Sequence, residues 1–378
     1  MEGVKPERLI RLSKSCLGEA EKLAVMGVLE RDFLGMGSEV QQFEQALTEF
    51  FGRPAVCVVN GTAALQLALE GCDVGEGDEV LVQSLTYVAS FQAISATGAK
   101  PVACDIDPVT LTLDWRDAEK RLTSKTKALM PVHYSGGVGA LDEIYAFAHK
   151  HGLRVIEDAA HAFGTVYKGK RVGGFGDISC FSFDGIKSIT SGEGGCIVTD
   201  DPDLLTRVKD SRLLGVEKDT EKRYTSRRSW EFDVSAQGWR YHMSNIMAAI
   251  GLTQLKSYPV MAKKRQSLAL YYDDLLYGHQ SIKNIPNDYA TVVPHIYVIR
   301  ISEMQNRKLI QEKLINLGIQ TGIHYQPNHL LSFYNEKNAL PLPITDAVFP
   351  ELLSLPLHPD LNNEDVDFVS KTLLEILL

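Results

Sequence analysis

Several common features are missing from this sequence of 378 residues, and each absence narrows the class of protein. No apolar run approaches the ~20 residues that a membrane-spanning helix needs, and the first residues, MEGVKPERL, contain no apolar signal region. The net charge of −9 argues against a broad basic surface for nucleic acid. We therefore expect a cytoplasmic protein whose partners include neither membranes nor nucleic acids.

Sequence patterns for metals, dinucleotides and P-loop phosphates are missing too. The six cysteines form no CxxC pair and mostly lie in apolar runs such as AVCVV, which is typical of buried free thiols in a reducing compartment. The ten histidines show no HExxH spacing, so we expect no metal ion. No GxGxxG follows a predicted strand. The stretch GTVYKGKR has Arg171 where a P-loop has Ser or Thr, and KGK is better interpreted as a β-turn.

What the sequence does contain is an alternation of short apolar runs and helical patterns between residues 55 and 200. AVCVV precedes NGTAALQLALEG, and EVLVQS precedes TYVASFQAISATG. Uniformly apolar strands separated by helices predict an α/β fold whose mostly parallel central sheet is sandwiched by helices. A polar excursion at 216–236 and a long helical stretch from Met243 follow. We expect a large domain at 1–250 and a smaller α+β C-terminal domain at 251–378.

Reactive side chains follow three of the predicted strands. Ligands gather at the carboxyl ends of strands in open α/β sheets. Residues 60–62, Asn-Gly-Thr, open a helix and offer an anion site, although an ordinary helix cap would use the same residues. Asp158 ends LRVIED, with His161 three residues later, and could equally cap the next helix. Lys187 follows DISCFSF, where a lone lysine is more often a surface charge.

Taken together, these features suit pyridoxal 5'-phosphate better than they suit three unrelated structural roles. The phosphate of this cofactor needs a helix N-terminus, its aldehyde needs a lysine, and its ring nitrogen needs an acid that keeps it protonated. The glycines after Lys187 would let the backbone pass close to the ring. The combination predicts a pyridoxal-phosphate site at one edge of the sheet.

The motifs NGTAALQLAL, SLTYVASFQAI, IEDAAHAFG, FSFDGIKSITSGEGG and MSNIMAAIGLTQL occur in one order along the chain. With them, nearly the whole chain resembles the DegT/StrS-type nucleotide-sugar aminotransferases. The resemblance implies a pyridoxal-phosphate-dependent enzyme of the aspartate-aminotransferase fold, fold type I. It also implies L-glutamate as the amino donor and a homodimer whose active sites are shared between subunits.

The same resemblance implies roles for individual residues. Lys187 would form a Schiff base with the cofactor and move the proton, and Asp158 would pair with the ring nitrogen; these are the expected catalytic residues. When the amino group leaves glutamate, the cofactor would pass into its pyridoxamine form. The other expected contacts are Gly61, Thr62, Ala63 and Ser182 for the phosphate, Tyr87 and His161 for the ring, Arg240 for a phosphate, and His329 and Glu193 for the substrate.

One departure from the family pattern concerns Arg240. In GWRYH this arginine stands where relatives carry an asparagine that reaches the cofactor phosphate of the neighbouring subunit. An arginine can bind a phosphate through a charge-assisted fork. Whether Arg240 binds the cofactor phosphate, binds the substrate phosphate or is simply a surface residue stays open.

The expected acceptor is a dTDP-, GDP- or UDP-linked 4-keto-6-deoxyhexose. Lys187 favours amino transfer over the related dehydratases, which carry histidine there, and Glu193 in GEGG resembles enzymes that aminate C4. A 3-keto sugar, a cyclitol, or a non-catalytic protein that binds pyridoxal phosphate remain alternatives. The product would enter an amino-sugar pathway such as lipopolysaccharide O-antigen biosynthesis. Basic residues of the excursion either close over the diphosphate or form a solvated loop: Lys218, Lys222, Arg223, Arg227 and Arg228.

Overall fold

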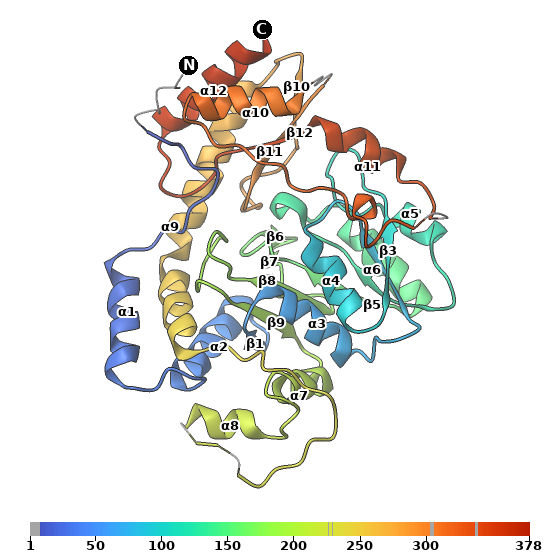
Figure 1. Ribbon diagram of the computed structural model, residues 1–378, viewed down its shortest axis with the longest axis vertical. Coiled ribbons are helices and arrows are strands. Elements are labelled where there is room, and N and C mark those ends of the chain that lie inside the picture. The colour runs from blue at the N-terminus through green and yellow to red at the C-terminus, as the bar shows by residue number, and fades with distance from the viewer. Residues whose placement is uncertain (1–7, 226, 229, 303–305, 337–338) are drawn as a thin grey trace.

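A seven-stranded sheet forms the centre of the molecule, as Figure 1 shows for the computed structural model, which describes residues 8–225, 227–228, 230–302, 306–336 and 339–378. Its order is β1-β9-β8-β5-β4-β2-β3. Only the two pairs that involve β9 are antiparallel, so the predicted mostly parallel α/β sheet is confirmed. The strands are β1 (Ala55–Val58), β2 (Glu79–Gln83), β3 (Lys100–Cys104), β4 (Thr126–Met130), β5 (Arg154–Asp158), β8 (Ile178–Ser182) and β9 (Gly195–Thr199).

The strands are apolar throughout because helices cover both faces of the sheet. Successive side chains of a strand point to opposite faces. In β1, accordingly, Val56 and Val58 belong to one buried cluster, and Ala55 and Cys57 belong to another. The first cluster contains residues of α3 (Gly61–Gly71), α4 (Val88–Ala96) and α7 (Pro202–Ser211), and the second contains residues of α2 (Ser38–Phe51) and α9 (Asn245–Leu276).

The remaining elements of this part of the chain are short or peripheral. The predicted turn at KGK is confirmed: Lys168 and Gly169, at φ values of 49° and 80°, join β6 (Val166–Tyr167) to β7 (Lys170–Arg171). The polar excursion contains the short helix α8 (Asp219–Tyr224), and its described residues from 227 to 237 are exposed. The other helices are α1 (Glu19–Glu30), α5 (Trp115–Lys120) and α6 (Leu141–His151).

A second, antiparallel sheet lies at the end of the molecule where both termini are drawn (Figure 1). Its order is β10-β11-β12, and α9 runs toward it from the central sheet. The predicted domain boundary after residue 250 falls inside α9 and stays a prediction. Ile10, near the N-terminus, pairs with Ile319 and packs in this C-terminal core. The elements are β10 (Ile282–Asn284), β11 (Tyr297–Ile301), β12 (Leu352–Leu355), α10 (Arg307–Asn316), α11 (Pro343–Val348) and α12 (Asn363–Leu377).

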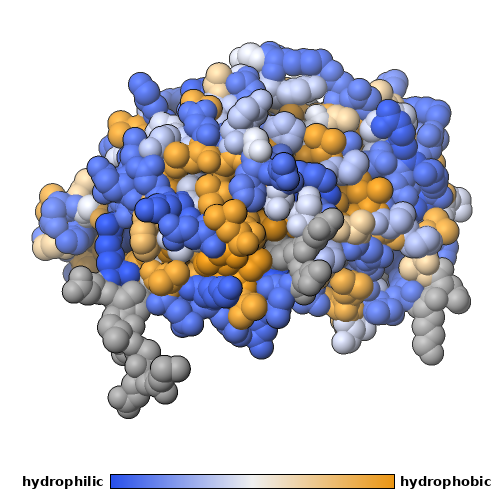
Figure 2. Space-filling view, turned by 90° about the horizontal axis from the view of Figure 1, so that it is seen from above, coloured by the Kyte–Doolittle hydropathy of each residue, from blue (hydrophilic) through white to orange (hydrophobic). Residues whose placement is uncertain are grey.

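All six cysteines are free, and four of them are buried in strands of the central sheet. Within the described ranges, no helix has the length and apolarity needed to cross a membrane, and no three His, Cys, Asp or Glu side chains gather as a metal site. Seen from the end that holds the second sheet, the surface is largely hydrophilic, with a band of hydrophobic side chains near its middle (Figure 2).

Candidate active site

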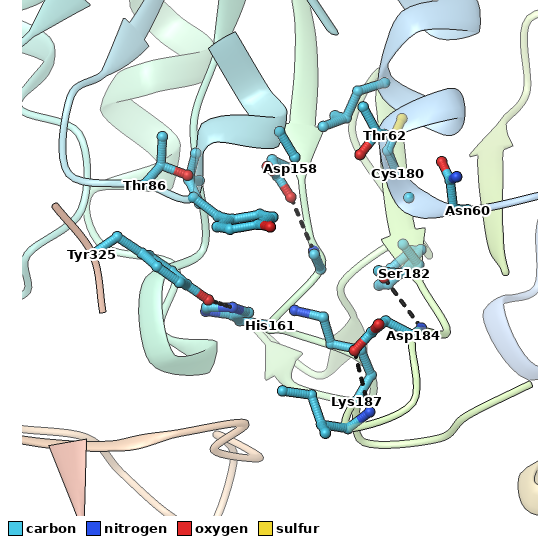
Figure 3. A pocket seen from close by; sticks show the side chains of 18 of the residues that line it. Asn60, Thr62, Thr86, Asp158, His161, Cys180, Ser182, Asp184, Lys187 and Tyr325 are labelled. Atoms are coloured by element: carbon cyan, nitrogen blue, oxygen red, sulfur yellow. Dashed lines mark hydrogen bonds between the residues drawn. The ribbon is translucent and has the colours of Figure 1, made fainter. Parts of the chain in front are cut away.

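A cavity of about 420 Å³ opens at the carboxyl edge of the central sheet. The chain leaves β1, β2, β5 and β8 at this edge, which is where open α/β sheets bind ligands. Figure 3 shows side chains from these strand ends, and from the segment at Tyr325, turned toward one space. Most of the residues singled out in the sequence line it: Gly61, Thr62, Tyr87, Asp158, His161, Ser182, Lys187 and Glu193.

The first turn of α3 forms one wall of this cavity. Asn60 caps the helix, and its Oδ1 accepts the N–H of Ala63 at 2.8 Å. Gly61 lets this turn approach the end of β8, because a Cβ at position 61 would lie 2.8 Å from the Cβ of Ser182. The N–H groups at a helix start attract anions. Gly61, Thr62 and Ser182 therefore form a cradle suited to a phosphate group.

Asp158, at the end of β5, is held by hydrogen bonds in the wall of the cavity. It is 6% exposed. Its Oδ2 accepts the Ser90 hydroxyl at 2.7 Å, and its Oδ1 accepts the Ala160 N–H at 3.2 Å. The Ser90 Oγ lies 3.0 Å from the Thr86 Oγ1. These contacts fix the orientation of one carboxylate that faces the same space as the α3 cradle.

Lys187 enters the cavity from the loop between β8 and β9. Its Nζ lies 3.5 Å from the Nε2 of His295. Burial lowers the pKa of Lys187 to about 8, although the carboxylates of Asp158 and Asp184 act in the opposite direction. A much larger fraction of this amine is therefore neutral near pH 8 than of an exposed lysine, which is the state a nucleophile or base requires.

Three histidines lie near Lys187: His161 and His295 are buried, and His324 is half-buried. Burial is the main cause that lowers the pKa of His161 and His295 well below the usual value and that of His324 to about 4, and the charge of Lys187 adds to it. We therefore treat all three rings as neutral at pH 7. The Nε2 of His161 lies 2.9 Å from the Tyr325 hydroxyl (Figure 3). Because these rings are neutral, they can hydrogen-bond and stack in the cavity, and they do not repel a cationic group that approaches Lys187.

Three of the predicted site residues do not line this cavity. The Ala63 N–H is engaged in the helix cap. Arg240 is exposed and forms a β-bridge with Leu213. His329 lines a separate groove, where both of its ring nitrogens have partners within the chain. Glu193 does line the cavity, and partial burial, together with the carboxylate of Asp184, raises its pKa.

Several residues that line the cavity or contact its Asp158 and Lys187 were not singled out in the sequence. Thr86 lies beside Tyr87, and Ser90 lies one helical turn further along α4, so the hydroxyls in SLTYVAS were a usable signal for both. His295, His324 and Tyr325 belong to the C-terminal part of the chain. No local spacing connects them to Lys187, and only the fold brings them to it.

The lowered pKa of Lys187 predicts selective chemical modification. In protein prepared without pyridoxal phosphate, we expect trinitrobenzenesulfonate to modify Lys187 with a rate that rises between pH 7 and 9, with a midpoint at about 8. At pH 8 the neutral fraction of such an amine is about 100-fold larger than that of an ordinary lysine. Peptide mass spectrometry gives the rate at each lysine, with the exposed Lys283 as the control. Equal pH profiles for Lys187 and Lys283 would contradict the expectation.

Comparison with known proteins places this cavity in context. A family model described as the DegT/DnrJ/EryC1/StrS aminotransferase family matches residues 15–374. The aminotransferase TlmJ from Streptoalloteichus hindustanus is 32% identical, has a TM-score of 0.90, and is matched over 98% of this chain and 100% of its own. The sugar aminotransferase CalS13 from Micromonospora echinospora is 28% identical, with a TM-score of 0.89 and coverage of 97% and 100%.

A third structure, Spr1654 from Streptococcus pneumoniae, is known in a PLP form and a PMP form. The PLP form is 30% identical to this chain, with a TM-score of 0.90, and the match covers 98% of this chain and 100% of that one. The similarity to each of the three structures thus extends over at least 97% of this chain.

Proposed function

Since the chain belongs to the DegT/DnrJ/EryC1/StrS aminotransferase family, we propose that it moves the amino group of L-glutamate to C4 of a nucleotide-linked 4-keto-6-deoxyhexose. It is a sugar aminotransferase, and its cofactor is pyridoxal 5'-phosphate. The donor, the nucleotide and the position of amination are what the proposal adds. Glutamate leaves as 2-oxoglutarate, and the keto oxygen of the sugar is replaced by the amino group.

The observation that carries the proposal is the meeting of three features in one cavity. The α3 cradle suits a phosphate, Asp158 suits the ring nitrogen, and Lys187 offers an amine of lowered pKa. Pyridoxal phosphate has three functional parts, a phosphate, a ring nitrogen and an aldehyde, and each of these three features suits one of them. When bound, the cofactor supplies an aldehyde that carries the amino group and a protonated ring that withdraws electrons from the reacting carbon.

Each residue then has a defined task in the proposed reaction. The N–H groups of Gly61 and Thr62 and the hydroxyl of Ser182 hold the phosphate. The carboxylate of Asp158, held by Ser90, keeps the proton on the ring nitrogen. The Nζ of Lys187 takes the proton from Cα of glutamate and later returns a proton at C4 of the sugar.

A nucleotide-linked acceptor is supported by charge outside the cavity. The basic side chains of the excursion lie at the start of α8, within it or in the exposed stretch after it, and they include Arg227 and Arg228. Cationic side chains on such a segment can pair with a diphosphate. Glu193, on the cavity wall, is the residue that favours C4, through the resemblance of GEGG to the sequences of C4 enzymes.

A homodimer with shared active sites forms part of the proposal. Among the described residues of 216–240, none lines the Lys187 cavity of its own chain, so the exposed side chains of Arg227, Arg228 and Arg240 can serve a neighbour. Large apolar side chains on α1 are exposed, among them Leu23 at 66% and Met26 at 53%. Trp230, in the excursion, is 87% exposed. A second copy of the chain would cover such surfaces.

The proposal is tested by visible absorption of the enzyme loaded with pyridoxal phosphate. We expect L-glutamate to bleach the band of the bound cofactor, and one nucleotide-linked 4-keto-6-deoxyhexose from a panel to restore it. The panel includes 3-keto isomers, a keto cyclitol and the free sugar as controls. Restoration by a 3-keto sugar or a cyclitol would overturn the acceptor, and a band that glutamate leaves unchanged would overturn the donor.

A further inference from the structure

Two walls of the Lys187 cavity consist of irregular backbone. Thr86 and Tyr87 lie between β2 and α4, and His324 and Tyr325 lie on the segment that leads from the C-terminal part of the chain. The rings of Tyr87 and Tyr325 are in contact, with centroids 5.4 Å apart and their planes tilted by 47°. Neither wall is held by the hydrogen bonds of a strand or a helix. The distance between the two walls therefore depends on contacts made just outside the cavity.

Asn328 makes the first of these contacts. It is 0% exposed, and its side-chain amide donates to the carbonyls of Ser84 at 3.1 Å and Thr86 at 2.9 Å. Its backbone N–H also donates to the Ser84 carbonyl, at 2.9 Å. A single buried side chain thus ties the segment of Tyr325 to the loop that carries Tyr87. Loss of this amide would leave the buried Thr86 carbonyl without this donor, which costs more than the hydrogen bond itself, while the Ser84 carbonyl would keep the backbone N–H of Asn328.

His329 adds a second set of contacts to the same loop. Its backbone N–H donates to the Ser84 Oγ at 3.1 Å, and its Nδ1 lies 2.7 Å from that oxygen. Its Nε2 lies 2.9 Å from Oδ1 of Asp346, on α11. The hydrogen-bond pattern assigns the proton to Nε2, so that the Ser84 hydroxyl donates to Nδ1. Both ring nitrogens are therefore occupied, and the ring lies in a separate groove.

The loop fixed in this way also reaches Asp158. Thr86, whose carbonyl accepts from Asn328, has its Oγ1 3.0 Å from the Oγ of Ser90. Ser90 in turn donates to Asp158 at 2.7 Å. A continuous set of hydrogen bonds therefore runs from residues 328 and 329, through the loop of Tyr87, to the carboxylate that faces the cofactor site.

We propose that Asn328 and His329 are positioning residues that latch the Tyr325 segment to the Ser84–Tyr87 loop and thereby set the cofactor ring between Tyr87 and Asp158. His329 acts through Ser84 and does not contact the sugar, in contrast to the role expected from the resemblance. The inference rests on the proposed function in that pyridoxal phosphate occupies the cavity, but it requires neither a particular donor nor a particular sugar.

The test uses the intact enzyme and two readouts that need no sugar: the dissociation constant of pyridoxal phosphate and the circular dichroism of its visible band. We expect Asn328→Ala to weaken cofactor binding about 10-fold and to change the dichroism, because hydrogen bonds that order the loop are lost. We expect His329→Ala to act in the same direction, and His329→Asn, which keeps an acceptor near the Ser84 hydroxyl, to restore part of the effect. Leu330→Ala, on the same turn but without a side-chain bond to the loop, is the control.

A smaller change keeps the test decisive if Asn328→Ala does not fold. Ser84→Ala removes only the hydroxyl that His329 contacts. We expect it to weaken cofactor binding as much as His329→Ala does. We expect the double variant Ser84→Ala/His329→Ala to bind the cofactor no more weakly than the more affected of the two single variants. If the two substitutions weakened cofactor binding additively, the latch would be overturned.

Wild-type cofactor affinity and dichroism in His329→Ala, with a raised KM for the keto sugar alone, would show that His329 is a sugar contact and would overturn the proposal. Failure of every sugar in the panel would overturn the acceptor while leaving these readouts intact.

Discussion

Replacing Lys187 by alanine is expected to abolish transamination while the protein stays folded. Lys187 lines the cavity, and burial lowers its pKa to about 8. In the proposed reaction the same Nζ binds the cofactor and moves the proton between carbon atoms. Loss of a positioned acid–base group alone costs about 10²–10⁴ in rate. Because the covalent role is lost as well, we expect the glutamate half-reaction to fall by at least about 10⁴-fold.

The measurement is single-turnover absorption of the cofactor band with glutamate, which separates chemistry from product release. Lys283→Ala, at an exposed position on β10, is the matched control and should react like the wild type. Thermal unfolding of both variants shows whether the fold is intact. Transamination by a folded Lys187→Ala variant at a rate within tenfold of the wild type would refute the assignment of Lys187.

Replacing Asp158 by asparagine is expected to produce the second-largest loss, with the cofactor still bound. An amide has nearly the shape of the carboxylate and can still accept the Ser90 hydroxyl, which lies 2.7 Å away in the wild type. It cannot keep a proton on the ring nitrogen, because it carries no negative charge. We expect both half-reactions to slow by about 10²–10⁴, while binding of the phosphate by Gly61, Thr62 and Ser182 persists.

A modified cofactor distinguishes this role from a structural one. Pyridoxal phosphate methylated at the ring nitrogen carries a permanent positive charge there and needs no carboxylate to maintain it. We expect this analogue to restore part of the rate in Asp158→Asn and to give no gain in the wild type. Single-turnover rates with both cofactors provide the comparison. A near-normal rate with the natural cofactor, or no gain with the analogue, would contradict the pairing of Asp158 with the ring nitrogen.

The part of the fold that could be predicted is the part where local sequence and burial agree. β5 and β8 are apolar because both faces of the sheet are covered, and their ends are marked by Asp158 and by the turn toward Lys187. The direction of β9 could not be predicted, since a strand buried on both faces has the same apolar pattern in either direction. The single antiparallel strand is a property of the connection between β8 and β9.

The candidate site divides along similar lines. Gly61, Asp158 and Lys187 follow strands directly, so the rule for strand ends brings them to one edge. His295 and Tyr325 were missed because their partners Lys187 and His161 lie 108 and 164 residues away in the sequence. For His329, a motif gives the position of a residue but not the direction of its side chain. The structure turns this ring toward Ser84 and Asp346.

The most direct measurement identifies the lysine that carries the cofactor. Borohydride reduction of the enzyme loaded with pyridoxal phosphate makes the bond between cofactor and lysine permanent, and peptide mass spectrometry then locates it. We expect one label per chain, on the peptide that contains Lys187, and no label in Lys187→Ala. A label on another lysine, or a cofactor that dialyses away after reduction, would contradict the assignment of this cavity as the active site.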